Sequence, residues 1–85
     1  MYIASLELIL KELRNLSQLK KNQSGRIKGF LDQELSVKML EMGCLPGTEV
    51  CIELVAPLGD PIAISIEDYC LSIRREDAQK ILIED

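Results

Sequence analysis

The side chains best suited to covalent chemistry are three cysteines, Cys44, Cys51 and Cys70. A thiol nucleophile needs a neighbouring base, which in most enzymes is a histidine. The chain contains no histidine, and Lys20 and Lys21 lie in a polar stretch that offers no buried setting for a neutral amine. We therefore expect no catalytic residue and no enzymatic activity.

The residue types and their spacing also argue against a metal site. No two cysteines have the short spacing of a zinc site, and ferrous iron favours imidazole and carboxylate ligands in a defined geometry. Glu49 and Glu53 would share one face of a strand, but about 13 Å of strand rise separates them. We expect no metal ligand and no cofactor. The first residues carry no secretory signal, and the cysteines are not expected to pair. Both observations are typical of a protein in the reducing cytoplasm.

Charge is distributed unevenly along the chain. The net charge of −4 argues against binding to nucleic acids. Residues 20–29 nevertheless hold four basic side chains and no acidic one, whereas acids outnumber bases over residues 50–85. A basic strip on an acidic protein indicates a surface for a partner, and a solvated face is the alternative.

Six residues are candidates for partner binding. Leu45 and Leu58 stand in segments rich in turn-forming residues, where an exposed aliphatic side chain can mark an interaction patch or fold back over the core. Four basic residues would form one rim if the strands that carry them pair, and a solubilising role is the alternative. The candidates are Arg26, Lys28, Leu45, Leu58, Arg74 and Arg75.

Helical spacing of apolar residues predicts helices over residues 2–16 and 34–42. An alternating pattern at Leu6, Leu8 and Leu10 leaves a strand open for the first of them. The first segment cannot span a membrane, because charged residues interrupt it. Its wide stripe could cover the open end of a barrel or pair with a second copy, so monomer and homo-oligomer both remain open.

Turn-forming residues punctuate the rest of the chain. Gly43 stands where a helix ends with positive φ, and Pro46-Gly47 predicts a type II turn. The run PLGDP predicts a loop. The residues expected to shape these turns are Gly43, Pro46, Gly47, Pro57, Gly59, Asp60 and Pro61.

Alternating patterns predict strands over residues 25–31, 48–56, 62–66, 70–74 and 81–83, with one helical turn over 75–80. Short antiparallel strands joined by tight turns favour a small closed barrel. The fold class expected is mainly β with short helices: a barrel of about five strands, with an N-terminal helix and a helix between the first strands. The expected core is Leu35, Met39, Val50, Ile52, Leu54, Ile62, Ile64, Ile66, Leu71, Ile73, Ile81 and Ile83.

Three segments together, MLEMGCLPGTEV (39–50), VAPLGDPIAISI (55–66) and CLSIRREDAQKILI (70–83), resemble the FeoA family. These are small SH3-like partners of the ferrous-iron transporter FeoB. The resemblance runs from about residue 16 to 84, which implies a FeoA-like domain over 16–85 and an N-terminal helical extension over 1–15.

The resemblance implies a cytoplasmic adaptor in ferrous iron transport and transition metal homeostasis, recruited to the inner face of the membrane by FeoB, a transporter that carries a GTPase. The alternative is an SH3-like regulatory or peptide-binding module related to the C-terminal domain of metal-dependent repressors. With only Tyr2, Phe30 and Tyr69 as aromatic residues, a groove for proline-rich peptides is disfavoured. A nucleic-acid-binding barrel is disfavoured for the same reason and by the acidic charge.

Overall fold

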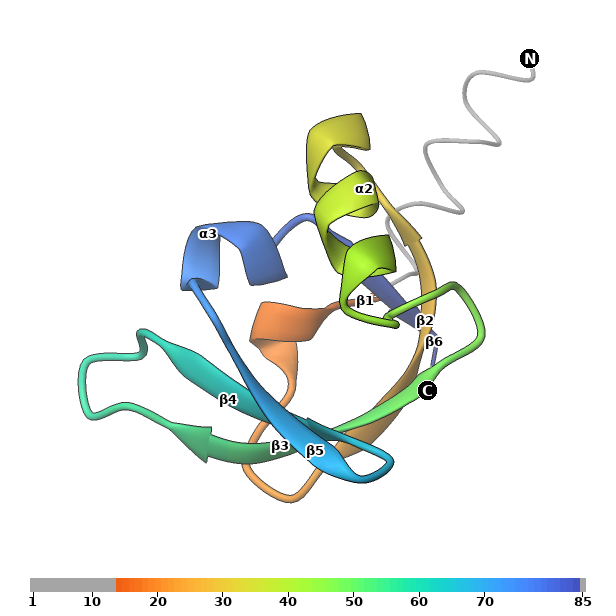
Figure 1. Ribbon diagram of the computed structural model, residues 1–85. Coiled ribbons are helices and arrows are strands. Elements are labelled where there is room, and N and C mark those ends of the chain that lie inside the picture. The colour runs from red at the N-terminus through yellow and green to blue at the C-terminus, as the bar shows by residue number, and fades with distance from the viewer. Residues whose placement is uncertain (1–13, 85) are drawn as a thin grey trace, which may run out of the picture.

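A computed structural model describes residues 14–84, which form one mainly β domain with two short α-helices (Figure 1). In chain order the elements are β1 (Arg14–Asn15), the 3-10 turn η1 (Leu16–Gln18), β2 (Ser24–Phe30), α2 (Gln33–Glu41), β3 (Glu49–Val55), β4 (Ile62–Ile66), β5 (Tyr69–Ile73), α3 (Arg75–Ala78) and β6 (Ile81–Glu84). No helix within this part of the chain is long and apolar enough to cross a membrane.

Six strands form a single antiparallel sheet in the order β1-β6-β2-β3-β4-β5. The closed barrel that we expected is wrong, because this sheet is open within residues 14–84. Its edges are β1 and β5, and β1 has only two residues with which to pair. The sheet curves around the core, η1 packs against α3 and β6, and α2 packs against β2 (Figure 1).

The predicted N-terminal helix lies outside the described residues except for its last three positions. There the prediction is wrong, because Arg14 and Asn15 pair with Ile83 and Leu82 of β6, and Leu16 opens η1. The backbone N–H of Asn15 donates to Gln18 Oε1 over 2.8 Å, which supports the turn locally. Pairing with a strand from the far end of the chain thus outweighs the local helical pattern at these residues.

Helix α2 begins and ends one residue before the helix predicted over residues 34–42. Asp32 precedes it, and its carboxylate accepts the backbone N–H of Glu34 over 3.1 Å, as an N-cap does. Gly43 follows it with φ +82°, and Gly47 has φ +96° in the turn closed by the Thr48 N–H and the Leu45 carbonyl. Both glycines hold the left-handed conformation that other residues adopt only with strain.

Two β-bulges interrupt the alternation of the strands. On β3, Ile52 lies opposite Ile64 and Leu54 lies opposite Ala63, so Glu53 is an extra residue. The inward set therefore stops at Ile52, and the expectation that Leu54 is core is wrong, since 55% of it is exposed. A second bulge, between Ile27 and Gly29, places Lys28 as the extra residue of β2 against β6.

The core contains most of the expected residues. Leu71 is half-buried against it, and ten others are buried: Leu35, Met39, Val50, Ile52, Ile62, Ile64, Ile66, Ile73, Ile81 and Ile83. The sequence analysis did not assign Leu16, Leu19, Ile27, Cys44 and Ala78, which are also buried. Leu40 of α2 lies outside this core, with 55% of it exposed.

Candidate partner-binding site

The hairpin between β3 and β4 presents the most exposed large apolar residue of the described chain. Leu58 is 93% exposed, whereas every other large apolar residue in residues 14–84 is less than two-thirds exposed. The loop that carries it is closed by two backbone hydrogen bonds, from Gly59 N–H to the Ala56 carbonyl (2.7 Å) and from Ala56 N–H to the Pro61 carbonyl (3.1 Å). Leu58 is therefore offered to solvent on an ordered turn.

The start of α3 fastens the same loop. The backbone N–H of Arg75 donates to Asp60 Oδ1 over 2.9 Å. A Cβ built on Gly59 would lie 2.9 Å from Arg75 Nη1, and Gly59 has φ +87°, so only glycine fits there without a shift. Leu58, Arg74 and Arg75 thus lie in one region, and we call these three residues the hairpin-tip surface.

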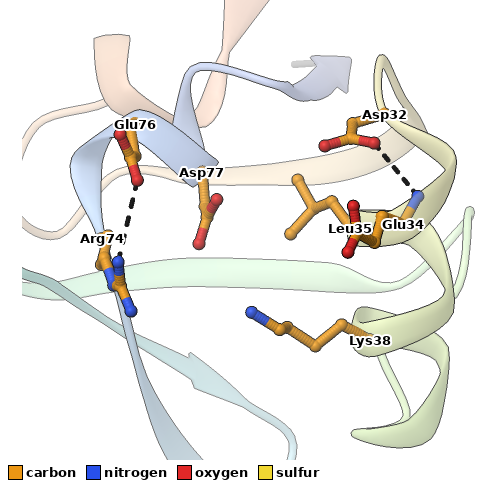
Figure 2. A pocket seen from close by; sticks show the side chains of 7 residues that line it. All are labelled: Asp32, Glu34, Leu35, Lys38, Arg74, Glu76 and Asp77. Atoms are coloured by element: carbon orange, nitrogen blue, oxygen red, sulfur yellow. Dashed lines mark hydrogen bonds and ion pairs between the residues drawn. The ribbon is translucent and has the colours of Figure 1, made fainter.

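An open hollow of about 230 Å³ lies beside this surface, between α2 and α3 (Figure 2). Lys38 and Leu35 extend from α2 toward α3, and Asp77 extends from α3 toward them (Figure 2). The lining residues are Asp32, Glu34, Leu35, Lys38, Arg74, Glu76 and Asp77. Four acidic side chains and two basic ones line the hollow, so negative charge predominates there. The hollow can contact polar groups of a protein.

Arg74 is the member of the hairpin-tip surface that also lines this hollow. Its guanidinium lies 3.8 Å from Glu76, with both side chains more than two-thirds exposed. An ion pair this exposed contributes little to folding. Arg74 can therefore exchange Glu76 for an acidic group of a partner at small cost.

The other three candidates lie elsewhere. Arg26 on β2 stands opposite Glu49 of β3 and Glu84 of β6, and Lys28 follows it on the same strand. Leu45 is in the turn that leads into β3. The single basic rim required β2 to pair with the strand that ends at Arg74. That premise is wrong, because β3 and β4 lie between β2 and β5.

Sequence reasoning missed an apolar groove beside α2. Phe30, Ser36, Leu40, Cys44, Leu45 and Pro46 line an open hollow of about 140 Å³, which we call the α2 groove. Leu40 is 55% exposed and Leu45 is 45% exposed. The sequence signal was present, because Leu40 is three residues from Val37, another exposed residue of α2, and this pair falls off the stripe of Leu35 and Met39.

The three thiols are free and differ in exposure: Cys44 is buried, Cys51 is half-buried and Cys70 is exposed. Burial raises the pKa of the Cys44 thiol, and a hydrogen bond with the Tyr69 side chain opposes that shift in part. The Tyr69 hydroxyl also donates to the Met42 carbonyl. Within residues 14–84, no three His, Cys, Asp or Glu side chains gather as a metal site would require.

A small, curved antiparallel sheet with short helices and ordered loops is shared with solved SH3-like proteins. The structure superposes with a TM-score of 0.72 on FeoA of Stenotrophomonas maltophilia, described as a prokaryotic SH3 domain protein in complex with zinc. The identity is 20% over 82% of this chain and 88% of that one. The protein is therefore of the SH3-like class.

The family follows from the sequence. The FeoA domain model matches residues 14–85, so the chain belongs to the FeoA family. A FeoA-like protein of Clostridium acetobutylicum is 34% identical, covers 85% of each chain and has a TM-score of 0.78. The resemblance to FeoA that the sequence analysis found is confirmed.

Two further similarities bear on function. A Fe(2+) transport protein A/Fe(2+) transporter FeoB fusion protein of Porphyromonas gingivalis is 47% identical over 47 residues. That match covers 55% of this chain and only 6% of the fusion protein. A manganese-dependent transcriptional repressor superposes with a TM-score of 0.79 at 13% identity, over 87% of this chain and 37% of that one. The repressor similarity concerns the fold alone.

Proposed function

We propose that this protein is a non-enzymatic, cytoplasmic accessory protein of ferrous iron uptake, which binds the transporter FeoB on its cytoplasmic side and modulates its GTPase. The observation that carries the proposal is the fusion protein, in which a FeoA segment like this one and FeoB occupy a single chain. Fusion keeps two partners at high effective concentration, which is of use when they must meet. A separate chain needs a docking surface to achieve the same meeting.

The hairpin-tip surface is the docking surface that we propose. Leu58 is an apolar side chain with almost no contact in the free protein, and its loop is already ordered by hydrogen bonds. An ordered loop loses little conformational entropy on binding. Arg74 and Arg75 flank it with positive charge, so an apolar pocket rimmed by acidic residues is the complementary site on FeoB.

The experiment measures the affinity of the full chain for full-length FeoB of the same organism in detergent micelles, with and without a non-hydrolysable GTP analogue. We expect saturable binding that Leu58→Ser weakens about tenfold or more, since burying a leucine contributes about 1.5–3 kcal/mol. Leu54→Ser is the matched control, because Leu54 is also an exposed leucine but lies on β3 outside the tip. It should bind as the wild type does.

Charge is tested separately. Arg74→Glu should weaken binding and reduce its dependence on salt concentration, because an attraction becomes a repulsion. Arg26→Glu should change neither the affinity nor its dependence on salt concentration, since Arg26 lies between Glu49 and Glu84 away from the tip.

Failure of the folded wild-type chain to bind FeoB in any nucleotide state would overturn the adaptor function. Binding that is equally strong in Leu58→Ser would overturn only the choice of surface.

A further inference from the structure

The sheet ends on one side in an open strand, β5 (Figure 1). Its residues, Tyr69–Ile73, pair with β4 along their whole length without a bulge, and no strand within residues 14–84 follows on the other side. The opposite edge strand, β1, has only two residues. Proteins commonly protect an edge strand by making it short, or with a charged residue, a proline or a bulge. None of these occurs in β5, so its free edge can accept another strand.

The pairing with β4 decides which backbone groups of β5 face the open edge. Ile66 and Tyr69 are paired across a two-residue turn, so they exchange both backbone hydrogen bonds, and the bonded pairs then alternate along the ladder. Cys70 and Ser72 fall between the bonded pairs, and both residues are exposed. Their N–H and C=O groups therefore point away from β4, toward solvent.

Helix α2 leaves this edge accessible. It approaches β5 at Tyr69, whose hydroxyl donates to the Met42 carbonyl. Farther along the strand, an open hollow of about 290 Å³ lies between the helix and Ser72 and Ile73 of β5. The edge near Ser72 thus has room for a further backbone.

The charges that flank β5 indicate which strand fits it. Glu67 and Asp68 precede the strand. Arg74 and Arg75 follow it, and no charged residue lies between. Two copies of β5 that run antiparallel bring the acidic start of one strand beside the basic end of the other. Opposite charges that face each other across paired strands are stabilising, whereas a parallel pair would set like charges together. A second copy of this chain is therefore complementary to the edge.

We propose that two copies of this chain form a dimer through antiparallel pairing of their β5 strands, with Leu71 of each copy at the twofold axis. In this register Cys70 of each copy lies opposite Ser72 of the other, so every outward N–H and C=O group of these two residues gains a partner. Asp68 of each copy lies opposite Arg74 of the other. The exposed ion pair of Arg74 with Glu76 can be exchanged for this contact at small cost.

The inference does not rest on the proposed function, because it concerns two copies of this chain alone. Arg74 also belongs to the hairpin-tip surface, so the dimer and the complex with FeoB compete for that side chain.

Sedimentation equilibrium of the full chain tests the proposal, at concentrations from about 10 µM to about 1 mM, because a contact limited to one pair of strands makes a weak dimer. A thiol reductant prevents a disulfide between exposed Cys70 side chains. We expect a monomer–dimer equilibrium. Asp68→Arg alone and Arg74→Glu alone should each raise Kd about fivefold or more, since each sets like charges at both contacts.

An equal mixture of these two variants should restore the dimer, because a mixed pair has opposite charges at both contacts. Arg26→Glu is the matched control for Arg74→Glu, since it changes the net charge equally but lies on β2, and it should leave Kd unchanged.

A further variant tests the backbone contact without changing the charge. Ser72→Pro removes an N–H that faces the open edge, where a sheet tolerates proline, and it should abolish the dimer. Circular dichroism reports that each variant is folded, and the mixture decides the proposal if Ser72→Pro does not fold. A wild-type chain that stays monomeric over the whole concentration range would overturn the proposal. A dimer that survives in folded Ser72→Pro, or a mixture no more dimeric than either charge variant alone, would place the contact on another surface and would also overturn it.

Discussion

At the level of single residues, exposure and order occur together at Leu58. Its loop is held by backbone hydrogen bonds from Gly59 to Ala56 and from Ala56 to Pro61, and by the hydrogen bond from the Arg75 backbone N–H to the Asp60 carboxylate. An exposed leucine contributes almost nothing to folding, so these bonds shape the loop without any help from its side chain. The same leucine can contribute its full transfer free energy when a partner buries it. This separation lets a substitution at Leu58 test binding without disturbing the fold.

The cysteines give a second test at this scale. Thiolate is the reactive form, and burial raises the pKa of Cys44 while its side chain has no solvent contact. We expect iodoacetamide at neutral pH to modify Cys70 first and Cys51 next, with Cys44 at least about a hundredfold slower because its reaction requires local opening. Peptide mass spectrometry over a time course measures the three rates.

Guanidinium chloride at a denaturing concentration is the control, and it should make the three rates similar. The raised pKa of Cys44 also makes the free energy of unfolding depend on pH. The stabilisation from the neutral, buried thiol is fully present below the ordinary thiol pKa. It is lost as pH rises above that value, because the thiol then ionises first in the unfolded chain. Equal reactivity of Cys44 and Cys70 in the folded protein would contradict the assigned burial.

At the level of elements, the packing of β2 against β6 depends on a residue without a side chain. A Cβ built on Gly25 would lie 2.2 Å from Ile83 Cγ2, whereas a Cβ on Gly29 would meet nothing within 4 Å. Gly25→Ala should therefore lower the free energy of unfolding by about 1–3 kcal/mol. Gly29→Ala, in the same strand, should change it by less than about 1 kcal/mol.

Urea denaturation of the two variants measures both values. The pair separates the steric effect at Gly25 from the general effect of replacing a strand glycine. A loss of stability in Gly29→Ala as large as that in Gly25→Ala would show that backbone freedom, and not contact with Ile83, governs this strand.

The elements also show where sequence reasoning succeeds and where it stops. Periodicity and turn chemistry located α2, the four longer strands and the turns at Gly43 and Gly47, because these features depend on neighbouring residues. The bulge at Glu53 depends on how β4 aligns with β3, so alternation alone placed Leu54 inside. The strand at Arg14 depends on β6 at the other end of the chain.

The candidate site divides in the same way. Leu58 and Leu45 could be selected from the sequence, because turn residues surround them. The grouping of Leu58 with Arg74 and Arg75 required knowledge of which segments meet, and the hydrogen bond between Arg75 and Asp60 supplies it. The same knowledge removes Arg26 and Lys28 from that group, since two strands separate them from β5.

At the level of the whole molecule, one core connects elements that are distant in sequence. Leu16 of η1, Met39 of α2, Ile64 of β4 and Ile81 of β6 all belong to the same buried cluster. The surfaces considered for binding lie outside it, on the hairpin tip and beside α2. Substitutions at these surfaces can therefore change the affinity for a partner, whereas the stability of the fold depends on the buried cluster.

A comparison of Ile64 with Leu54 tests this division for the whole domain. Ile64 has no exposed surface and lies in the middle of β4, so Ile64→Ala should cost about 2–5 kcal/mol through lost burial and the cavity it leaves. Leu54→Ala removes a side chain that is 55% exposed and should cost less than about 1 kcal/mol. Thermal unfolding followed by circular dichroism measures both, and each kcal/mol should lower Tm by about 4–8 °C in a domain of this size.

Because the cluster joins both helices to the sheet, Ile64→Ala should shift the helical and strand signals together in one transition. Loss of the strand signal at a temperature where the helical signal remains would show that the core is divided, and a similar Tm for the two variants would show that Leu54 is buried in solution.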